Sequence, residues 1–341
     1  MKSVEKQIIS KHFIKRIGLN QDQLIKVVRQ ISDAYNLGGI RLMRGIEEGY
    51  EDVNIELRTD KDRYVLKLLV NYLTKQARSR EEAKYYVYVM DQFAKGGIRV
   101  PRLYTSKEGK NLYELSFGKD NKILRVIVME FFEGKHFFEI TPTLEDMQNI
   151  SLILGDLHSL DFPLQENVYD DPWQPQFLHK HFKVHSKIFP LKERQIFEEM
   201  VEKVRLLKLG KYNKTPTHGD IMRNNVMKNT DGEYCLLDFG VVTKNYWIID
   251  LALFLAGFCL DPKLDTDTNQ KTYDEVTDSY ARHRLVDVDF KDDLHLLTSA
   301  SYGAFYLAAT IEKEVERNLS AENKYWINLG RKGIQMMKSL N

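Results

Sequence analysis

The stretches THGDIMRNNVM, residues 217–227, and EYCLLDFG, residues 233–240, decide how this sequence is interpreted. They place Asp220 five residues before Asn225 and eighteen residues before Asp238. Phosphoryl transfer needs these groups: one carboxylate orients the attacking hydroxyl and accepts its proton, and oxygen ligands hold Mg²⁺ against the phosphates. Carboxylate and amide oxygens suit Mg²⁺ rather than zinc. The pattern therefore points to phosphoryl-transfer chemistry.

The second stretch predicts a strand that ends at a carboxylate. Asp238 follows the apolar residues 234–237 and precedes Phe239 and Gly240, where a tight turn could free its side chain. Protein kinases arrange the same parts as His-Arg-Asp, with an Asn five residues later, followed by Asp-Phe-Gly. In this chain the first triplet is His-Gly-Asp.

The rest of the sequence predicts strands first and helices afterwards. Hydrophobic spacing favours a helix at 21–36 and another at 79–95, and extended segments at 55–57, 64–70, 112–117 and 124–132. After Gly134, helices are expected at 144–159, 176–209, 269–284 and 290–317, interrupted by a β-rich insert from His218 to Val242. This order predicts an α+β fold with two lobes, residues 1–131 and 132–341. A crevice between lobes is a common ligand site.

The motifs together resemble a known superfamily. His-Gly-Asp, the Asn five residues later, Leu-Asp-Phe-Gly and Asp-Leu-Ala at 250–252 are similar to the aminoglycoside phosphotransferase and choline kinase superfamily, over most of the chain. Residues 45–54, GIEEGYEDVN, followed by YVLKLL at 64–69, resemble the bacterial type II homoserine kinases. The resemblance implies a protein-kinase-like fold and an enzyme that transfers the γ-phosphoryl group of ATP, with Mg²⁺, to a hydroxyl of a small molecule: an amino alcohol, a sugar or an aminoglycoside-like compound.

The resemblance also implies roles for the matched residues of the catalytic segment. Asp220 would be the catalytic base, and Asn225 and Asp238 would bind magnesium. His218 would brace the catalytic loop, and Asp250 would stabilise that loop from the start of the next helix.

For the nucleotide, the resemblance implies that Lys67 contacts the α- and β-phosphates and that a glutamate on a helix pairs with Lys67. A charge inside a buried strand is costly unless it is paired, so a partner for Lys67 is expected. Glu82 is preferred to Glu81, because it lies on the helix face that carries the apolar stripe. The other members of that face are Tyr86, Val89 and Phe93.

Two further segments would hold the nucleotide. The hinge would run from Met129 to Phe132, with backbone groups of Glu130 and Phe132 binding adenine. The segment from Gly45 to Asn54 would cover the phosphates. It has Gly45 and Gly49 but lacks the Gly-x-Gly-x-x-Gly pattern of protein kinases, so an ordinary acidic turn is the alternative.

Arg223 departs from the superfamily, which usually has His-Pro-Gly-Asn where this chain has Met-Arg-Asn. An arginine three residues after the base could reach the γ-phosphate or an anionic substrate group, and it is a candidate catalytic residue. It could equally pair with a carboxylate of the helical lobe. His158 is expected to be a core histidine rather than a ligand.

Composition limits the partners of the chain. Its 341 residues carry a net charge of +1, which gives no reason to expect nucleic acid or a membrane as a partner. Cys235 and Cys259 lie in apolar runs and are expected to be buried thiols in a reducing compartment. No signal peptide is apparent at the N-terminus, so a cytoplasmic location is expected. The alternatives to a small-molecule kinase are a protein Ser/Thr kinase and a non-catalytic nucleotide-binding pseudokinase on the same fold.

Overall fold

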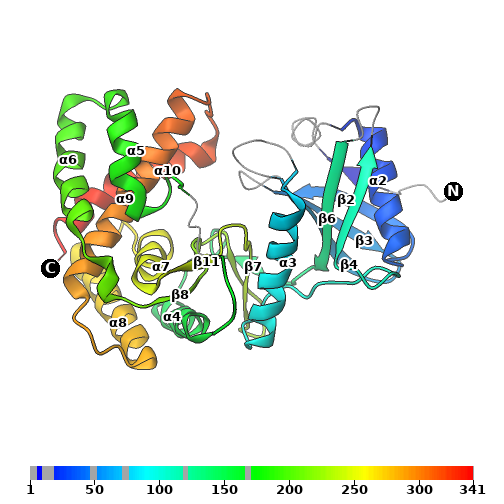
Figure 1. Ribbon diagram of the computed structural model, residues 1–341, viewed down its shortest axis with the longest axis horizontal. Helices are drawn as coiled ribbons and strands as arrows, with labels where there is room; N and C mark the ends of the chain where they lie inside the picture. The colour runs from blue at the N-terminus through cyan, green and yellow to red at the C-terminus, as the bar shows by residue number, and fades with distance from the viewer. Residues whose placement is uncertain are drawn as a thin grey trace. The chain divides into compact units, whose positions relative to one another are not determined.

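The chain forms two compact units, Met1–Glu133 and Gly134–Asn341. The computed structural model describes residues 6–9, 19–46, 52–70, 77–117, 122–165 and 170–340. The first unit is built around a β-sheet and the second mainly from helices (Figure 1). This confirms the α+β fold with a β-rich and a helical lobe that the sequence predicts.

The sheet of the first unit has six strands in the described part of the chain, in the order β1-β2-β3-β4-β6-β5. Strand β1 pairs parallel with β2, and the other neighbouring pairs are antiparallel. The strands are β1 (Lys6–Ile8), β2 (Ile40–Ile46), β3 (Val53–Thr59), β4 (Arg63–Leu68), β5 (Leu112–Phe117) and β6 (Lys122–Glu130).

Helix α2 (Gln21–Ala34) covers one face of this sheet. Its start is fixed by a capping box, in which Asn20 and Gln23 each accept a hydrogen bond from the other's backbone N–H. Its buried residues recur at helical spacing and pack into one core with alternate residues of β3 and β4. That core includes Leu24, Val28, Ile31, Ile55, Leu57, Leu66 and Leu68.

Helix α3 (Arg80–Lys95) lies on the other side of the strands (Figure 1). Because side chains alternate along a strand, Lys67 points away from the face that Leu66 and Leu68 share with α2. Its Nζ atom lies 5.1 Å from the centre of the Tyr86 ring on α3. Lys67 therefore occupies the α3 side of the sheet.

The second unit contains helices α4 (Leu144–Ser159), α5 (Leu178–His185), α6 (Leu191–Leu206), α7 (Trp247–Phe254), α8 (Thr266–Arg284), α9 (Lys291–Glu314) and α10 (Ala321–Met337). The segment 176–209 is mainly helical, as the sequence predicts. It is divided into α5 and α6, because Phe189 is extended before Pro190, which has no N–H to continue a helix. No helix in the described ranges is long and apolar enough to cross a membrane.

Two small sheets of the second unit flank the His-Gly-Asp and Leu-Asp-Phe-Gly motifs. Strand β8 (Lys214–Thr217) pairs antiparallel with β11 (Thr243–Tyr246). Strand β9 (Val226–Lys228) lies between β10 (Tyr234–Leu236) and β7 (Lys135–His136). The loop from 218 to 225 therefore leaves one sheet and enters the other, and the loop from 237 to 242 returns. Both cysteines are free and buried in this unit, as expected.

Candidate active site

Asp220 and Asn225 lie in direct contact in the loop between β8 and β9. The Asn225 Nδ2 atom donates to the main-chain oxygen of Asp220 at 3.0 Å and to its carboxylate Oδ2 at 2.6 Å. The N–H groups of Met222 and Asn225 bond within the same turn, to Asp220 and Met222. The remaining polar atom of the Asn225 amide is Oδ1, an oxygen of the kind that Mg²⁺ binds. The predicted base and the predicted metal ligand are thus brought together.

Gly219 begins the turn of this loop with a backbone conformation that favours glycine. Its φ of 78° lies in the left-handed region, which L side chains rarely adopt. A Cβ atom at this position would also lie 3.3 Å from the main-chain oxygen of Val241. The two loops therefore approach each other closely at Gly219, just before Asp220.

Asp250, in the first turn of α7, is hydrogen-bonded to the start of the predicted catalytic loop. Its two carboxylate oxygens accept hydrogen bonds from the backbone N–H groups of His218 and Gly219, both at 2.7 Å. His158 Nε2 lies 3.1 Å from the same carboxylate, and His158 Nδ1 lies 2.7 Å from the Tyr280 hydroxyl. His158 is therefore a buried core histidine, as the sequence suggests.

Burial and hydrogen bonding together determine the charge states of His158 and Asp250. Burial lowers the pKa of His158, although the Asp250 carboxylate opposes the shift. Burial by itself would raise the pKa of Asp250, but the hydrogen bonds from His158 and Gly219 hold it below its ordinary value. A carboxylate that accepts several N–H hydrogen bonds remains ionised in this way. Asp250 is thus a fixed negative charge beneath the catalytic loop.

Asp238 follows directly on a residue that is bonded to the catalytic loop. The N–H of Leu237 donates to the main-chain oxygen of Asn225 at 2.8 Å, and His218 Nε2 lies 3.0 Å from the Leu237 oxygen. Asp238 has a φ of 60°, a left-handed conformation that is uncommon outside glycine. Its Oδ1 atom accepts from the N–H of Gly240 at 3.3 Å. These bonds join the loop that bears Asp238 to the loop that bears Asp220.

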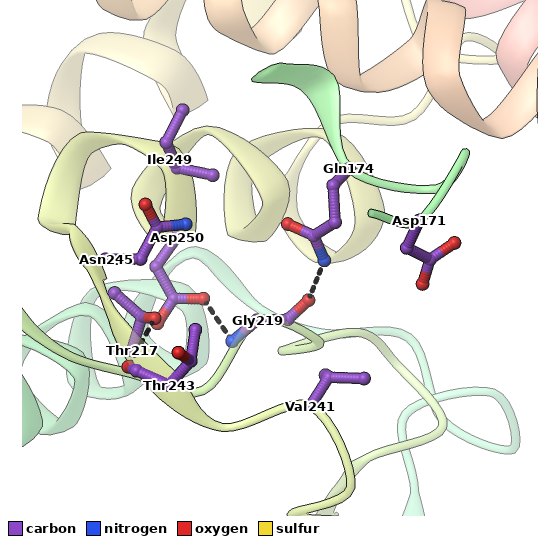
Figure 2. Close-up of a pocket in the computed structure, with 9 residues that line it drawn as sticks. All are labelled: Asp171, Gln174, Thr217, Gly219, Val241, Thr243, Asn245, Ile249 and Asp250. Carbon is purple, nitrogen blue, oxygen red and sulfur yellow. Dashed lines mark hydrogen bonds between the residues drawn. The ribbon is translucent and has the colours of Figure 1, made fainter. Parts of the chain in front are cut away.

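A pocket beside Gly219 contains two residues that the sequence did not single out, Asp171 and Gln174. Figure 2 shows Gly219 between Gln174 and Asp250, and Gln174 Nε2 donates to the Gly219 oxygen at 3.0 Å. Burial, with the nearby Asp170 carboxylate, raises the pKa of Asp171 to about 6. The other lining residues are Thr217, Val241, Thr243, Asn245 and Ile249. No local spacing marks Asp171 and Gln174, because the fold brings them to the loop from some fifty residues upstream.

Arg223 turns toward the helices of its own unit. Its Nε atom donates to the main-chain oxygen of Phe258 at 2.8 Å, in the π-helical turn Leu255–Cys259 that continues α7. Its Nη1 atom lies 3.9 Å from the Asp261 carboxylate. From the sequence, Arg223 could equally contact a phosphate or substrate group or pair with a carboxylate of the helical lobe. These contacts favour the second alternative.

In the first unit, Lys67 lies against Asp52. Its Nζ atom is 3.2 Å from the Asp52 Oδ2 atom, and the exposed fractions of the two side chains are 4% and 1%. Asp52 Oδ1 accepts from the N–H of Val70 at 2.7 Å and from Arg78 Nε at 3.2 Å. The partner that a buried lysine requires is therefore present, but it precedes β3 rather than lying on α3.

Glu82, the expected partner of Lys67, is occupied at the start of α3. Its Oε2 atom accepts from the N–H of Ser79 at 2.6 Å, and its own N–H donates to the Ser79 hydroxyl at 3.1 Å. This capping box satisfies backbone donors of the first helical turn. The structure thus gives Lys67 a different carboxylate from the one chosen by helical face.

The other residues that are predicted to bind the nucleotide, where the structure describes them, lie in or beside the sheet. Gly45 is inside β2 and Asn54 is inside β3, directly opposite Lys67, whereas Gly49 falls outside the described residues. Met129 and Glu130 end β6, and Phe132 follows it and is buried. The N–H of Glu130 donates to the Arg102 oxygen at 2.9 Å, so a hinge contact at Glu130 would use its carbonyl group.

These features define a class of protein: a two-lobed kinase-like phosphotransferase, with the predicted base and the predicted metal ligands on neighbouring loops. The chain belongs to the phosphotransferase enzyme family, whose family model matches residues 43–286. It is therefore a kinase that acts on small molecules. It is 26% identical over 258 residues to a homoserine kinase of Cupriavidus metallidurans, a match that covers 71% of this chain and 72% of that one.

Solved structures of small-molecule kinases share the fold. An amicoumacin kinase in complex with AMP-PNP, Ca²⁺ and its ligand aligns with a TM-score of 0.68 at 15% identity, over 97% of this chain and 96% of the other. A microcompartment-associated aminopropanol kinase aligns with a TM-score of 0.64 at 11% identity, over 92% and 96%. The resemblance to the aminoglycoside phosphotransferase superfamily and to homoserine kinases is confirmed.

Proposed function

We propose that this protein transfers the γ-phosphoryl group of ATP, with Mg²⁺, to the hydroxyl of a small molecule that also carries an amino group. The contact between Asp220 and Asn225 is the observation that carries this proposal. It sets a carboxylate beside an amide oxygen in a loop braced by Asp250, and in-line phosphoryl transfer needs little more from the protein than such positioning.

Each residue has a defined part in the proposed reaction. The Asp220 carboxylate accepts the proton of the acceptor hydroxyl as that oxygen attacks. Asn225 holds the carboxylate in one orientation through its Nδ2 atom. Lys67 binds the α- and β-phosphates, and backbone groups of Glu130 and Phe132 bind adenine. Arg223 keeps the loop against the turn after α7.

The donor groups also fit a magnesium ion. Asn225 Oδ1 and the Asp238 carboxylate would hold it, and as hard oxygen ligands they are typical of Mg²⁺ sites that leave other positions to phosphates and water. When bound, the ion neutralises charge on the phosphates that are being separated. The hydrogen bond that Asp238 Oδ1 accepts from the N–H of Gly240 holds the carboxylate within its turn.

The acceptor class is inferred from the relatives. Homoserine and aminopropanol, the compounds named for one relative and one structural neighbour, share a hydroxyl and an amine on a short chain. The test is ATP turnover by the full chain with homoserine, 3-aminopropan-1-ol, ethanolamine, an aminoglycoside, a neutral sugar and a generic protein. Turnover with an amino-bearing small acceptor and none with protein is expected. Transfer to protein alone, or Mg·ATP binding without any transfer, would contradict the proposal.

A further inference from the structure

We propose that Asp52 is the positioning residue of Lys67, so that the counter-ion of the phosphate-binding lysine comes from the sheet and not from helix α3. This inference rests on the proposed function, in which Lys67 binds the phosphates of ATP. It adds a residue to the nucleotide-binding apparatus that neither the motif nor the helical spacing indicates.

The two oxygens of the Asp52 carboxylate have separate tasks. Oδ1 accepts from the N–H of Val70 at 2.7 Å and from Arg78 Nε at 3.2 Å. Oδ2 lies 3.2 Å from Lys67 Nζ. One oxygen is therefore fixed by a backbone group and a guanidinium, and this fixes the other oxygen against the lysine.

Burial makes this contact effective. The side chains of Asp52, Lys67 and Arg78 are exposed by 1%, 4% and 6%. Charges interact more strongly where water is excluded, and a buried charge is stable only when it is paired. A lysine carries its charge on four flexible carbons, so a fixed carboxylate restricts where the ammonium group can lie. The centre of the Tyr86 ring also lies near the ammonium group, 5.1 Å from Nζ.

The register of the sheet explains how Asp52 reaches Lys67. Asn54 of β3 lies opposite Lys67 of β4, and Asp52 is two residues before Asn54, so it lies on the same face of the sheet. Val70, which holds Asp52, follows the end of β4. The pair is thus assembled within two neighbouring strands.

This arrangement has a consequence for regulation. In protein kinases the equivalent lysine pairs with a glutamate on a helix, so a movement of that helix can make or break the pair. Here Glu82 is held at the start of α3 by Ser79, and the Lys67 pair is formed inside the sheet. The contact between Lys67 and Asp52 is therefore made by the sheet, and α3 bears on it through Tyr86 and through Arg78, which precedes the helix.

The test compares three carboxylates of the first unit in the full chain. Asp52→Asn removes the proposed counter-ion, and Glu82→Gln removes the helix carboxylate. Glu56→Gln is the matched control, since Glu56 is a fully buried carboxylate on β3 that is held by Arg44, Arg58 and Arg63. For each variant, the KM for ATP, kcat, the Kd for Mg·ATP and the melting temperature would be measured.

Asp52→Asn should raise the KM and Kd for ATP about tenfold or more, as expected when a charge-assisted contact to the phosphates is lost. Glu82→Gln should leave both near wild type. Glu56→Gln should lower the melting temperature without changing the KM for ATP. A wild-type KM in Asp52→Asn, or an equal rise in Glu82→Gln, would overturn the inference.

Two further variants separate the possible causes of failure. Lys67→Ala should weaken ATP binding, and Asp52→Asn should add little to it in the double variant. If Lys67→Ala leaves ATP affinity unchanged, the proposed role of Lys67 fails, and with it the premise. Where Asp52→Asn does not fold, Asp52→Glu keeps the charge but displaces the carboxylate. Positioning predicts a raised KM for ATP in this variant also, and a wild-type KM would refute it.

Discussion

The side-chain amide of Asn225 donates to both the main-chain oxygen and the carboxylate of Asp220, at 3.0 and 2.6 Å. The residue proposed to hold the metal therefore also orients the proposed base. A change at either position should affect both proton transfer and metal binding, although to different degrees.

Replacement of Asp220 by Asn tests the base. The amide cannot accept the proton of the acceptor hydroxyl, so kcat should fall by about 10²- to 10⁴-fold, the usual contribution of general base catalysis. The affinity for Mg·ATP should remain close to wild type, because Asp220 is not among the proposed ligands of the nucleotide. Steady-state kinetics with an accepted substrate and a nucleotide-binding titration would measure both. Full activity in Asp220→Asn would remove it as the base.

Replacement of Asp238 by Asn tests the metal site without straining the turn. Asn tolerates the left-handed conformation that Asp238 adopts, at a φ of 60°, so the backbone should be retained. Loss of the negative charge should weaken Mg·ATP binding by about tenfold or more, as for changes around other bound metals. Asp231→Asn, in the exposed turn between β9 and β10, is the control. The measurement is ATP affinity at a series of Mg²⁺ concentrations, and equal affinities for the two variants would argue against the metal role.

Replacement of Asp250 by Leu tests the brace beneath the loop. The change leaves the N–H groups of His218 and Gly219 and the ring of His158 without their shared acceptor in a buried site. The free energy of unfolding should fall by about 3 kcal/mol or more, the usual effect of removing one partner of a buried charged network. Chemical denaturation would measure it. Unfolding at the wild-type denaturant concentration would show that the loop does not depend on α7.

The raised pKa of Asp171 predicts a stability that falls with pH. Its folded value of about 6 lies above the ordinary 3.8, so between these values the unfolded chain releases a proton that the folded chain keeps. Stability from this group is greatest below about pH 4 and declines to a lower level above about pH 6, by roughly 1 to 3 kcal/mol. Asp171→Asn should therefore melt at a higher temperature than wild type at pH 7, and the difference should disappear at pH 4.

Asp170→Asn is the matched control for that experiment. The hydrogen bond from Lys180 holds the pKa of Asp170 below its ordinary value, so its ionised form favours folding. Loss of that carboxylate removes the contact with Lys180 but also the charge that helps to raise the pKa of Asp171, so the melting temperature at pH 7 should change much less than in Asp171→Asn. An equal rise in both variants would mean that net charge, rather than the burial of Asp171, determines the effect.

The sequence is informative where contacts are local. The spacing of Asp220, Asn225 and Asp238 predicts neighbouring loops, because two short strands bring the end of one motif to the start of the other. The stretch Ser79 to Glu82 also carries a local signal, since Ser-x-x-Glu before an apolar run is typical of a capping box. That signal predicts the contact that Glu82 makes in the structure, whereas the helical face predicts a contact with Lys67.

The sequence does not predict the contacts between residues that lie on separate elements of the fold. Asp52 meets Lys67 only because β3 and β4 pair in one register, and a shift by one residue would turn it to the other face. Asp171 and Gln174 reach the catalytic loop from a segment that no motif marks. Arg223 donates to a main-chain oxygen in a π-helical turn, and the sequence does not indicate that this irregular turn places the oxygen within its reach.

The hydrogen bonds that Asp250 accepts from two successive backbone N–H groups also determine how this loop opens locally. In hydrogen–deuterium exchange, an amide exchanges only when the structure that protects it opens. The amides of His218 and Gly219 are held by a carboxylate that is itself inside the core of the helical unit. They should therefore exchange as slowly as the amides of α7, so that the loop proposed to carry the chemistry opens only together with the helix beneath it.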